Sequence, residues 1–186
     1  MLVATTHSHP ANTLAVRLPD DDLPTVHRVA IEHTFETAHR LPHLDGKCTS
    51  LHGHSWRVTV SVTAPHLSSD VTVVEFGALK AAVRHWIDTH LDHGTMLGFD
   101  DPFVETLTTT LGCKVFRFGA DHTASEPETL ATDLAWPTVE AVAVLLRRMS
   151  QHVLAGLPCA DNARVGRVFV RETQLNTADY GPGDTA

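Results

Sequence analysis

Several features are scarce in this 186-residue sequence, and each scarcity excludes a class of protein. The three cysteines, Cys48, Cys113 and Cys159, are odd in number and follow no framework spacing, which argues against a disulfide-stapled scaffold. Lysine and arginine together number 14 against 22 acidic residues, and the net charge of −8 excludes a broad basic surface. We therefore expect neither nucleic acid nor an anionic membrane as a partner.

Long apolar runs are also missing. None approaches the roughly 18 to 20 residues that span a bilayer, and the first 25 residues lack the apolar core and cleavage site of a signal peptide. The expectation is a soluble, cytoplasmic protein. Residues 1–25 show weak periodicity and are expected to form a loosely ordered N-terminal extension, followed by one domain over residues 26–180.

The periodicity of the remaining sequence predicts an α+β fold. Residues 56–63 alternate so that Val58, Val60 and Val62 share one face of a strand, and residues 76–91 carry apolar side chains at helical spacing. The segment 119–136 is polar and is expected to be a loop or insertion. The expected elements are strands at 26–38, 56–63, 113–118 and 164–173 and helices at 76–91 and 141–154.

Histidine, in contrast, is abundant, with 14 residues. His52 and His54 are two residues apart at the start of a predicted strand, so both imidazoles point to one face, and His39 closes the preceding strand. Three histidines without a fourth protein ligand are typical of a catalytic zinc site. A His-x-His pair alone is as often two ordinary polar residues on an exposed strand, but His39 and the nearby Cys48 favour a metal.

Three further positions are candidates for chemistry. Cys48 lies in the loop before His52, where a bound cation would favour the thiolate form. Asp92 and His93 form an acid–base pair at a predicted helix end, and Glu172 with Thr173 ends the last predicted strand. Taken singly, these are more often an inert cysteine, a helix cap and a solvated strand end. The candidate residues are Cys48, Asp92, His93, Glu172 and Thr173.

Taken together, the motifs resemble the 6-pyruvoyl/6-carboxytetrahydropterin synthase family in order and spacing over residues 28–180. They are residues 35–43 (FETAHRLPH), 48–56 (CTSLHGHSW), 91–93 (LDH), 137–140 (PTVE) and 170–173 (VRET), with Ala178 and Tyr180. The cysteine separated by three residues from His-Gly-His is similar to the 6-carboxytetrahydropterin synthase branch, which serves queuosine and 7-deazaguanine biosynthesis.

The resemblance implies the tunnelling fold (T-fold), an antiparallel sheet with helices on one face, and homo-oligomers, commonly hexamers, with active sites between subunits. It implies a carbon–carbon lyase that converts 7,8-dihydroneopterin triphosphate to 6-carboxy-5,6,7,8-tetrahydropterin, acetaldehyde and triphosphate. One alternative is a 6-pyruvoyltetrahydropterin synthase or another lyase acting on the pterin side chain. Another is a non-catalytic homologue that binds pterin or zinc.

The resemblance also assigns roles to residues. His39, His52 and His54 would bind Zn²⁺, and Cys48 would be the general base. The pair at 92–93, supplied by a neighbouring subunit, would be the second proton-transfer group. The substrate-binding residues would be Glu172, which would anchor the pterin ring, and Thr173.

This sequence departs from the family pattern at two places. Glu75 replaces a more usual aspartate before the first helix, which preserves the charge, and the span 97–136 is longer than in compact members. The triphosphate requires cations, which the sequence alone does not place. The available ones are Lys47, Arg40 and Lys80.

Overall fold

The structure, a computed structural model, describes residues 25–182. The expected N-terminal extension therefore lies outside the described residues, except for Thr25. Within the described part, no helix is long and apolar enough to cross a membrane.

The strands are β1 (His27–His39), β2 (His52–Ala64), β3 (Gly94–Gly98), β4 (Val115–Phe118), β5 (Arg164–Arg171) and β6 (Thr177–Tyr180). The helices are α1 (Phe76–His90), α2 (Phe103–Glu105) and α3 (Val139–Ala155). Shorter turns of helix cover Lys47–Thr49, Thr106–Thr110 and Pro127–Ala131.

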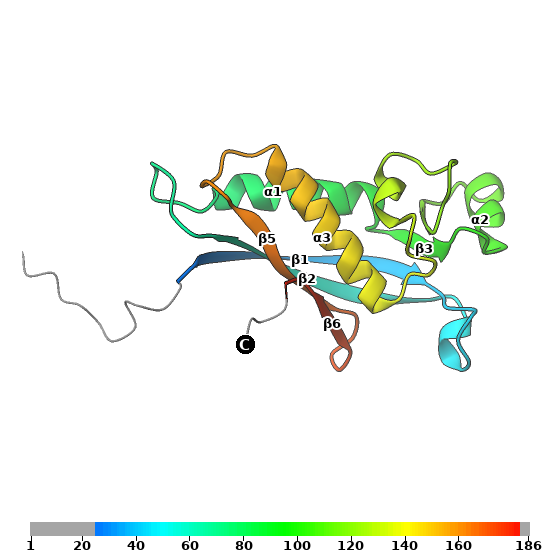
Figure 1. Cartoon of the computed structure of the whole chain (residues 1–186). Helices are drawn as coiled ribbons and strands as arrows, with labels where there is room; N and C mark the ends of the chain where they lie inside the picture. Colours follow the sequence, from blue (N-terminus) through cyan, green and yellow to red (C-terminus); the bar gives the residue numbers. More distant parts are fainter. Residues whose placement is uncertain (1–24, 183–186) are drawn as a thin grey trace, which may run out of the picture.

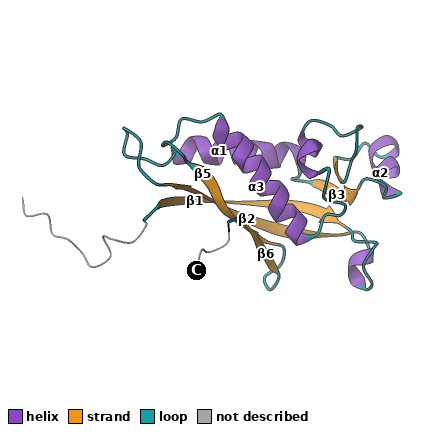
Figure 2. Ribbon diagram, viewed as in Figure 1, coloured by secondary structure: helices purple, strands orange, loops and turns teal. Residues whose placement is uncertain are grey.

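The strands form one six-stranded sheet in the order β4-β3-β1-β2-β5-β6. β1, β2, β5 and β6 pair antiparallel, as expected, whereas β3 and β4 extend the sheet by parallel pairing beside β1. The sheet is therefore mixed rather than purely antiparallel. Figures 1 and 2 show α1 and α3 on the same face of this sheet, which confirms an α+β fold with helices packed on one side.

The core lies between the sheet and these helices. Trp56, Val58 and Val60 of β2 are at most 1% exposed, and α1 and α3 bury their apolar stripes against them. Alternate residues of β2, such as Arg57, lie on the other face of the sheet and are exposed. This alternation gives the sheet one apolar face and one polar face.

Both long helices begin at a capping side chain. The carboxylate of Glu75 accepts hydrogen bonds from the N–H groups of Gly77 and Ala78, at 2.7 and 2.6 Å, so the change from aspartate retains an N-cap. At α3 the cap is Thr138, whose hydroxyl accepts a hydrogen bond from Ala141. Pro137, expected in the first turn of this helix, therefore lies just before it, where its carbonyl is free of the helix.

Candidate metal centre and the adjoining hollow

The pairing of β1 with β2 brings the three candidate histidines together. His39 is the register partner of His52, and His54 lies two residues further along β2 on the same side. One ring nitrogen from each histidine can be chosen so that all three lie within 4.8 Å of one another. Residues from two strands thus form a compact cluster with the size of a single metal site.

Backbone carbonyls orient two of these imidazoles. Nδ1 of His39 lies 2.9 Å from the oxygen of Pro137, and Nδ1 of His52 lies 2.8 Å from the oxygen of Ser50. A carbonyl oxygen only accepts, so each Nδ1 carries the hydrogen and each Nε2 keeps a lone pair. This outer hydrogen bond is the usual device that orients a metal-ligating histidine.

The cluster fits a divalent metal. His39 is fully buried, and its Nε2 has no hydrogen-bond partner, an arrangement that is unfavourable unless a ligand is bound there. Burial lowers the pKa of His39, although the contacts with Pro137 and Glu172 oppose this shift, and burial also lowers the pKa of His54. The neutral form, which binds metals, is therefore favoured. Three imidazoles are a donor set that suits zinc with an open position.

Glu172 faces the same cluster. Its Oε1 lies 3.3 Å from Nε2 of His39 and 3.9 Å from Nε2 of His54, without the alignment of a hydrogen bond. Glu172 and Thr173 follow the end of β5 instead of ending the strand, and the hydroxyl of Thr173 accepts hydrogen bonds from Leu175 and Asn176 within the turn to β6. The start of this turn therefore places the carboxylate of Glu172 beside His39 and His54.

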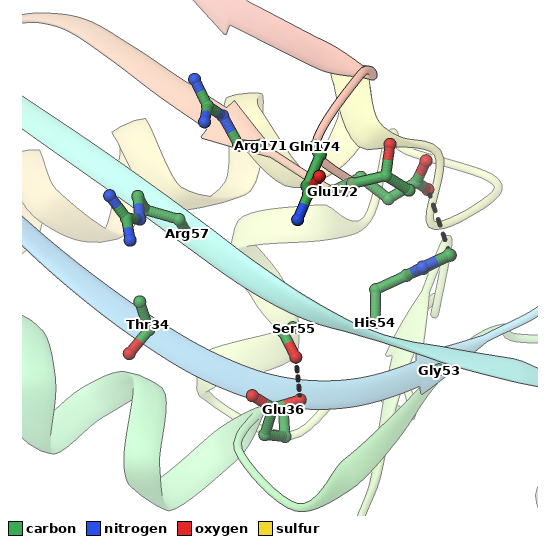
Figure 3. A pocket seen from close by; sticks show the side chains of 10 residues that line it. Thr34, Glu36, Gly53, His54, Ser55, Arg57, Arg171, Glu172 and Gln174 are labelled. Atoms are coloured by element: carbon green, nitrogen blue, oxygen red, sulfur yellow. Dashed lines mark hydrogen bonds and ion pairs between the residues drawn. The ribbon is translucent and has the colours of Figure 1, made fainter.

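A hollow of about 820 Å³ adjoins the cluster. Figure 3 shows His54 and Glu172 at one side of it and Arg57 and Arg171 at the other. The hollow therefore extends from His54 of the histidine cluster to the two arginines. Its lining residues are Thr34, Glu36, Gly53, His54, Ser55, Arg57, Arg171, Glu172, Thr173 and Gln174.

Cys48 lies in the short helical turn of the loop between β1 and β2 and is half-buried. Its backbone oxygen accepts a hydrogen bond from Leu41 at 2.7 Å, which closes the loop. Among the described residues, no hydrogen bond or ion pair joins its side chain to the histidine cluster. The loop brings Cys48 to the same end of the sheet as His39 and His52, which flank it.

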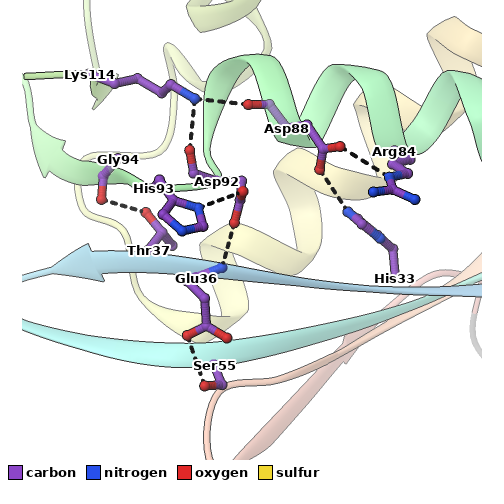
Figure 4. Close-up of polar contacts among 10 residues, drawn as sticks. All are labelled: His33, Glu36, Thr37, Ser55, Arg84, Asp88, Asp92, His93, Gly94 and Lys114. Carbon is purple, nitrogen blue, oxygen red and sulfur yellow. Dashed lines mark hydrogen bonds and ion pairs between the residues drawn. The ribbon is translucent and has the colours of Figure 1, made fainter.

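Asp92 and His93 are fixed against β1 just after α1 (Figure 4). Oδ1 of Asp92 accepts a hydrogen bond from the N–H of Glu36 at 2.8 Å, and Oδ2 accepts one from Nδ1 of His93 at 2.7 Å. The N–H of His93 in turn donates to the oxygen of Glu36. Burial alone would raise the pKa of Asp92, but these hydrogen bonds outweigh it and the pKa lies below its usual value. Asp92 therefore remains a carboxylate that holds the imidazole.

The imidazole of His93 is available to a ligand or to another subunit, since its side chain is 79% exposed. The described residues contain no contact between His93 and the cluster of His39, His52 and His54. Lys114 stabilises the same corner, because its Nζ donates to the backbone oxygens of Asp88 and Asp92 at 2.8 and 2.7 Å.

Sequence reasoning missed the arginines of the hollow. The cations considered for phosphate, Lys47, Arg40 and Lys80, do not line it, and Arg40 is held by Asp101 at 3.2 Å and lies over the ring of Phe103. Alternation along β2 places Arg57 on the polar face. Its pairing with Arg171 depends on the register between β2 and β5, and no sequence motif predicts that register.

Comparisons with known proteins agree with this architecture. A family model described as 6-pyruvoyl tetrahydropterin synthase matches residues 28–183. A Synechocystis relative named 6-carboxy-5,6,7,8-tetrahydropterin synthase is 38% identical over 95 residues, covering 47% of this chain and 74% of the relative. A relative from Halobacterium salinarum, named "Probable 6-carboxy-5,6,7,8-tetrahydropterin synthase", is 31% identical over 148 residues, covering 77% of this chain and 79% of the relative.

Solved structures share the fold at lower identity. A crystal structure of an uncharacterized protein from Wolinella succinogenes matches with a TM-score of 0.62 and 21% identity, covering 86% of this chain and 99% of that one. The Caenorhabditis elegans 6-pyruvoyl tetrahydropterin synthase matches with a TM-score of 0.56 and 19% identity, covering 86% and 97%. The T-fold expected from the motifs is thus confirmed, and with the family model spanning most of the chain, this protein belongs to the 6-pyruvoyl tetrahydropterin synthase family of enzymes.

Proposed function

We propose that this protein is a zinc-dependent carbon–carbon lyase that converts 7,8-dihydroneopterin triphosphate to 6-carboxy-5,6,7,8-tetrahydropterin, acetaldehyde and triphosphate, in queuosine and 7-deazaguanine biosynthesis. The single observation that carries the proposal is the three-histidine cluster with the unpartnered Nε2 of His39, which adjoins the hollow through His54. The names of the relatives support the choice of reaction.

His39, His52 and His54 would hold the metal. Bound there, zinc would supply Lewis-acid chemistry, polarising side-chain oxygens of the substrate so that a proton on the neighbouring carbon is easier to remove. The protein's own contribution is orientation, because Pro137 and Ser50 fix the imidazoles of His39 and His52 through their Nδ1 hydrogens.

Cys48 would be the general base that removes this proton, and the Asp92–His93 pair the second proton-transfer group. Asp92 holds His93 through Nδ1, which leaves Nε2 of the exposed imidazole for proton transfer at the substrate. The exposure of His93 and its separation from the histidine cluster favour the expectation that it serves the hollow of a neighbouring subunit in a homo-oligomer, commonly a hexamer in this family.

Glu172 and Thr173 would bind the pterin ring. A carboxylate accepts hydrogen bonds from the amino group and the ring N–H of such a heterocycle, and Glu172 borders the hollow at 14% side-chain exposure. Because Glu172 lies 3.3 Å from His39, a ring bound to it would lie close to a metal held by the histidines. The catalytic unit would be residues 26–180 of a soluble, cytoplasmic protein.

A second candidate is 6-pyruvoyltetrahydropterin synthase, because the family model and several solved neighbours carry that name. The two activities use the same substrate and differ in product. The discriminating experiment is mass spectrometry of the products from zinc-loaded protein and 7,8-dihydroneopterin triphosphate, with a parallel acetaldehyde assay. 6-Carboxytetrahydropterin with acetaldehyde supports the proposal. A pyruvoyl pterin assigns the second activity, and no turnover leaves a pterin- or zinc-binding homologue.

A further inference from the structure

Two arginines face each other across the polar side of the sheet. Arg57 of β2 is the register partner of Arg171 of β5, and both are exposed, whereas their neighbours Val58 and Val170 are buried on the helix side. Like charges directly opposite each other in an antiparallel pair destabilise the sheet. An arginine pair at this register is therefore unfavourable unless an anion is bound between the two side chains.

The protein itself does little to neutralise this pair. Nη1 of Arg57 lies 3.8 Å from Oε2 of Glu32, beyond hydrogen-bond distance, and both side chains are more than half exposed. Within residues 25–182, the side chain of Arg171 has no hydrogen bond or ion pair, although its backbone pairs with β2 and β6. By contrast, Arg117 donates two hydrogen bonds to the carboxylate of Glu128. Arg148 likewise donates two to the carboxylate of Asp133.

The position of the pair suits the far end of a substrate held at the histidine cluster. Both arginines line the hollow that also contains His54 and Glu172 (Figure 3). Arg57 follows His54 by three positions on β2, about 10 Å along a strand; alternation places the two side chains on opposite faces of β2, and the hollow that both residues line connects them. The carboxylates that line the hollow are Glu172, at the histidine cluster, and Glu36, which accepts a hydrogen bond from Ser55, whereas Arg57 and Arg171 are its lining arginines.

We propose that Arg57 and Arg171 form a polyphosphate subsite that binds the triphosphate of the substrate while the other end of the substrate lies at the histidine cluster. Guanidinium groups match phosphate oxygens in a bidentate manner, and two of them side by side provide donors for more than one phosphate. Gln174 adds an amide at the same hollow. The identity of the ligand rests on the proposed function, whereas the anion subsite rests on the arginine pair alone.

Binding of inorganic triphosphate tests the subsite without requiring turnover. Isothermal titration calorimetry would compare the wild type with Arg57→Gln, Arg171→Gln and the double variant, in zinc-loaded and in EDTA-treated protein, because triphosphate also binds zinc. The matched control is Arg164→Gln, an exposed arginine at the other end of β5 that does not line the hollow. We expect each single variant to weaken binding about tenfold and the double variant about 100-fold, with the control unchanged.

Unchanged binding in the double variant, or no binding by the wild type, would overturn the proposal. Misfolding is separated from loss of the subsite by thermal unfolding, since removing one of two facing like charges should leave the melting temperature equal or higher. Inorganic triphosphate should raise the melting temperature of the wild type and of Arg164→Gln but not that of the double variant.

Kinetics separate this proposal from the proposed function. In an active enzyme, Arg57→Gln and Arg171→Gln should raise KM for 7,8-dihydroneopterin triphosphate more than they change kcat, while binding of 7,8-dihydroneopterin, which has no phosphate, stays unchanged. If the protein has no lyase activity but the arginine variants still bind inorganic triphosphate more weakly than the wild type, the subsite stands and the proposed reaction fails. If the enzyme is active but neither KM nor triphosphate binding responds to the two substitutions, the reaction stands and the subsite fails.

Discussion

His39 donates its Nδ1 hydrogen to the backbone oxygen of Pro137, 98 positions away in the chain, across 2.9 Å. Pro137 immediately precedes Thr138, the N-cap of α3, so the start of that helix determines how a histidine of β1 is oriented. The bond fixes Nδ1 as the donor and directs the lone pair of Nε2 toward His52 and His54. The orientation of the histidine cluster thus depends on the packing of the helical layer on the sheet.

His52→Ala should lose zinc. It removes one of the three proposed ligands, and the cluster found among the described residues consists of three histidines, so the affinity for zinc should fall by at least about 100-fold. Zinc per chain, measured by inductively coupled plasma mass spectrometry after dialysis, checks this. His85→Ala, on α1 and outside the cluster, is the control and should retain the metal. Full zinc occupancy in His52→Ala would contradict the ligand assignment.

Cys48→Ala should separate chemistry from metal binding. If the thiol is the general base, turnover should fall by about 100-fold or more while the zinc content stays at the wild-type level. Cys113→Ala, at an exposed cysteine in another loop, should keep both. A wild-type rate for Cys48→Ala would remove this residue from the mechanism.

Lys114→Met should loosen the corner that holds Asp92 and His93. The change leaves the backbone oxygens of Asp88 and Asp92 without their shared donor, and losing such charged hydrogen bonds costs about 1.5–3 kcal/mol. In a chain of this size the melting temperature should fall by roughly 3 to 12 °C, since 1 kcal/mol corresponds to about 2 to 4 °C. Lys80→Met, at an exposed position of α1, should show no comparable decrease in differential scanning calorimetry. Equal melting temperatures for the two variants would refute the role of Lys114.

Glu128→Gln should make stability less dependent on pH. Burial alone would raise the pKa of Glu128, but hydrogen bonds from Arg117 and Ser125 outweigh it and lower the pKa to about 2. Because the folded pKa lies below the unfolded value, the stabilisation is complete above about pH 4.5 and disappears as the pH falls toward 2. A shift of this size corresponds to about 3 kcal/mol.

Urea unfolding at several pH values checks this. Glu128→Gln should be less stable than the wild type by about 3 kcal/mol at pH 7, and the difference should shrink between about pH 4.5 and pH 2.5. Asp121→Asn, at an exposed carboxylate in the same segment, is the control and should differ little from the wild type at any pH. A constant gap between Glu128→Gln and the wild type across this range would show that the carboxylate charge is not what stabilises the segment.

The main elements of the fold could be predicted because their periodicity is strong. The alternation around Val58 and the helical spacing in α1 reflect burial of one face, and the structure confirms both elements. β3 and β6 were missed because they are short, and β3 begins and ends with glycine. Such segments become strands through pairing with a neighbour, here β1 or β5, which local sequence does not encode.

The histidine cluster could be predicted from spacing, since the end of one strand lies beside the start of the next when consecutive strands pair antiparallel. The position of Glu172 could not, because its carboxylate reaches the histidines through a turn after β5. The pairing of Arg57 with Arg171 was equally hidden, since it depends on the register of two strands separated by 99 residues along the chain. Local sequence patterns indicate which face of a strand or helix is buried and how far apart residues lie along it. These two contacts depend instead on how distant segments pair in the folded chain.

The most direct test of the metal centre is X-ray absorption spectroscopy at the zinc edge of the zinc-loaded protein. Ligation by His39, His52 and His54 predicts three imidazole nitrogens at about 2.0–2.1 Å, with remaining scattering from oxygen and none from sulfur. Zinc–sulfur scattering at about 2.3 Å, or fewer than three imidazole ligands, would contradict a three-histidine centre that leaves Cys48 free to act as a base.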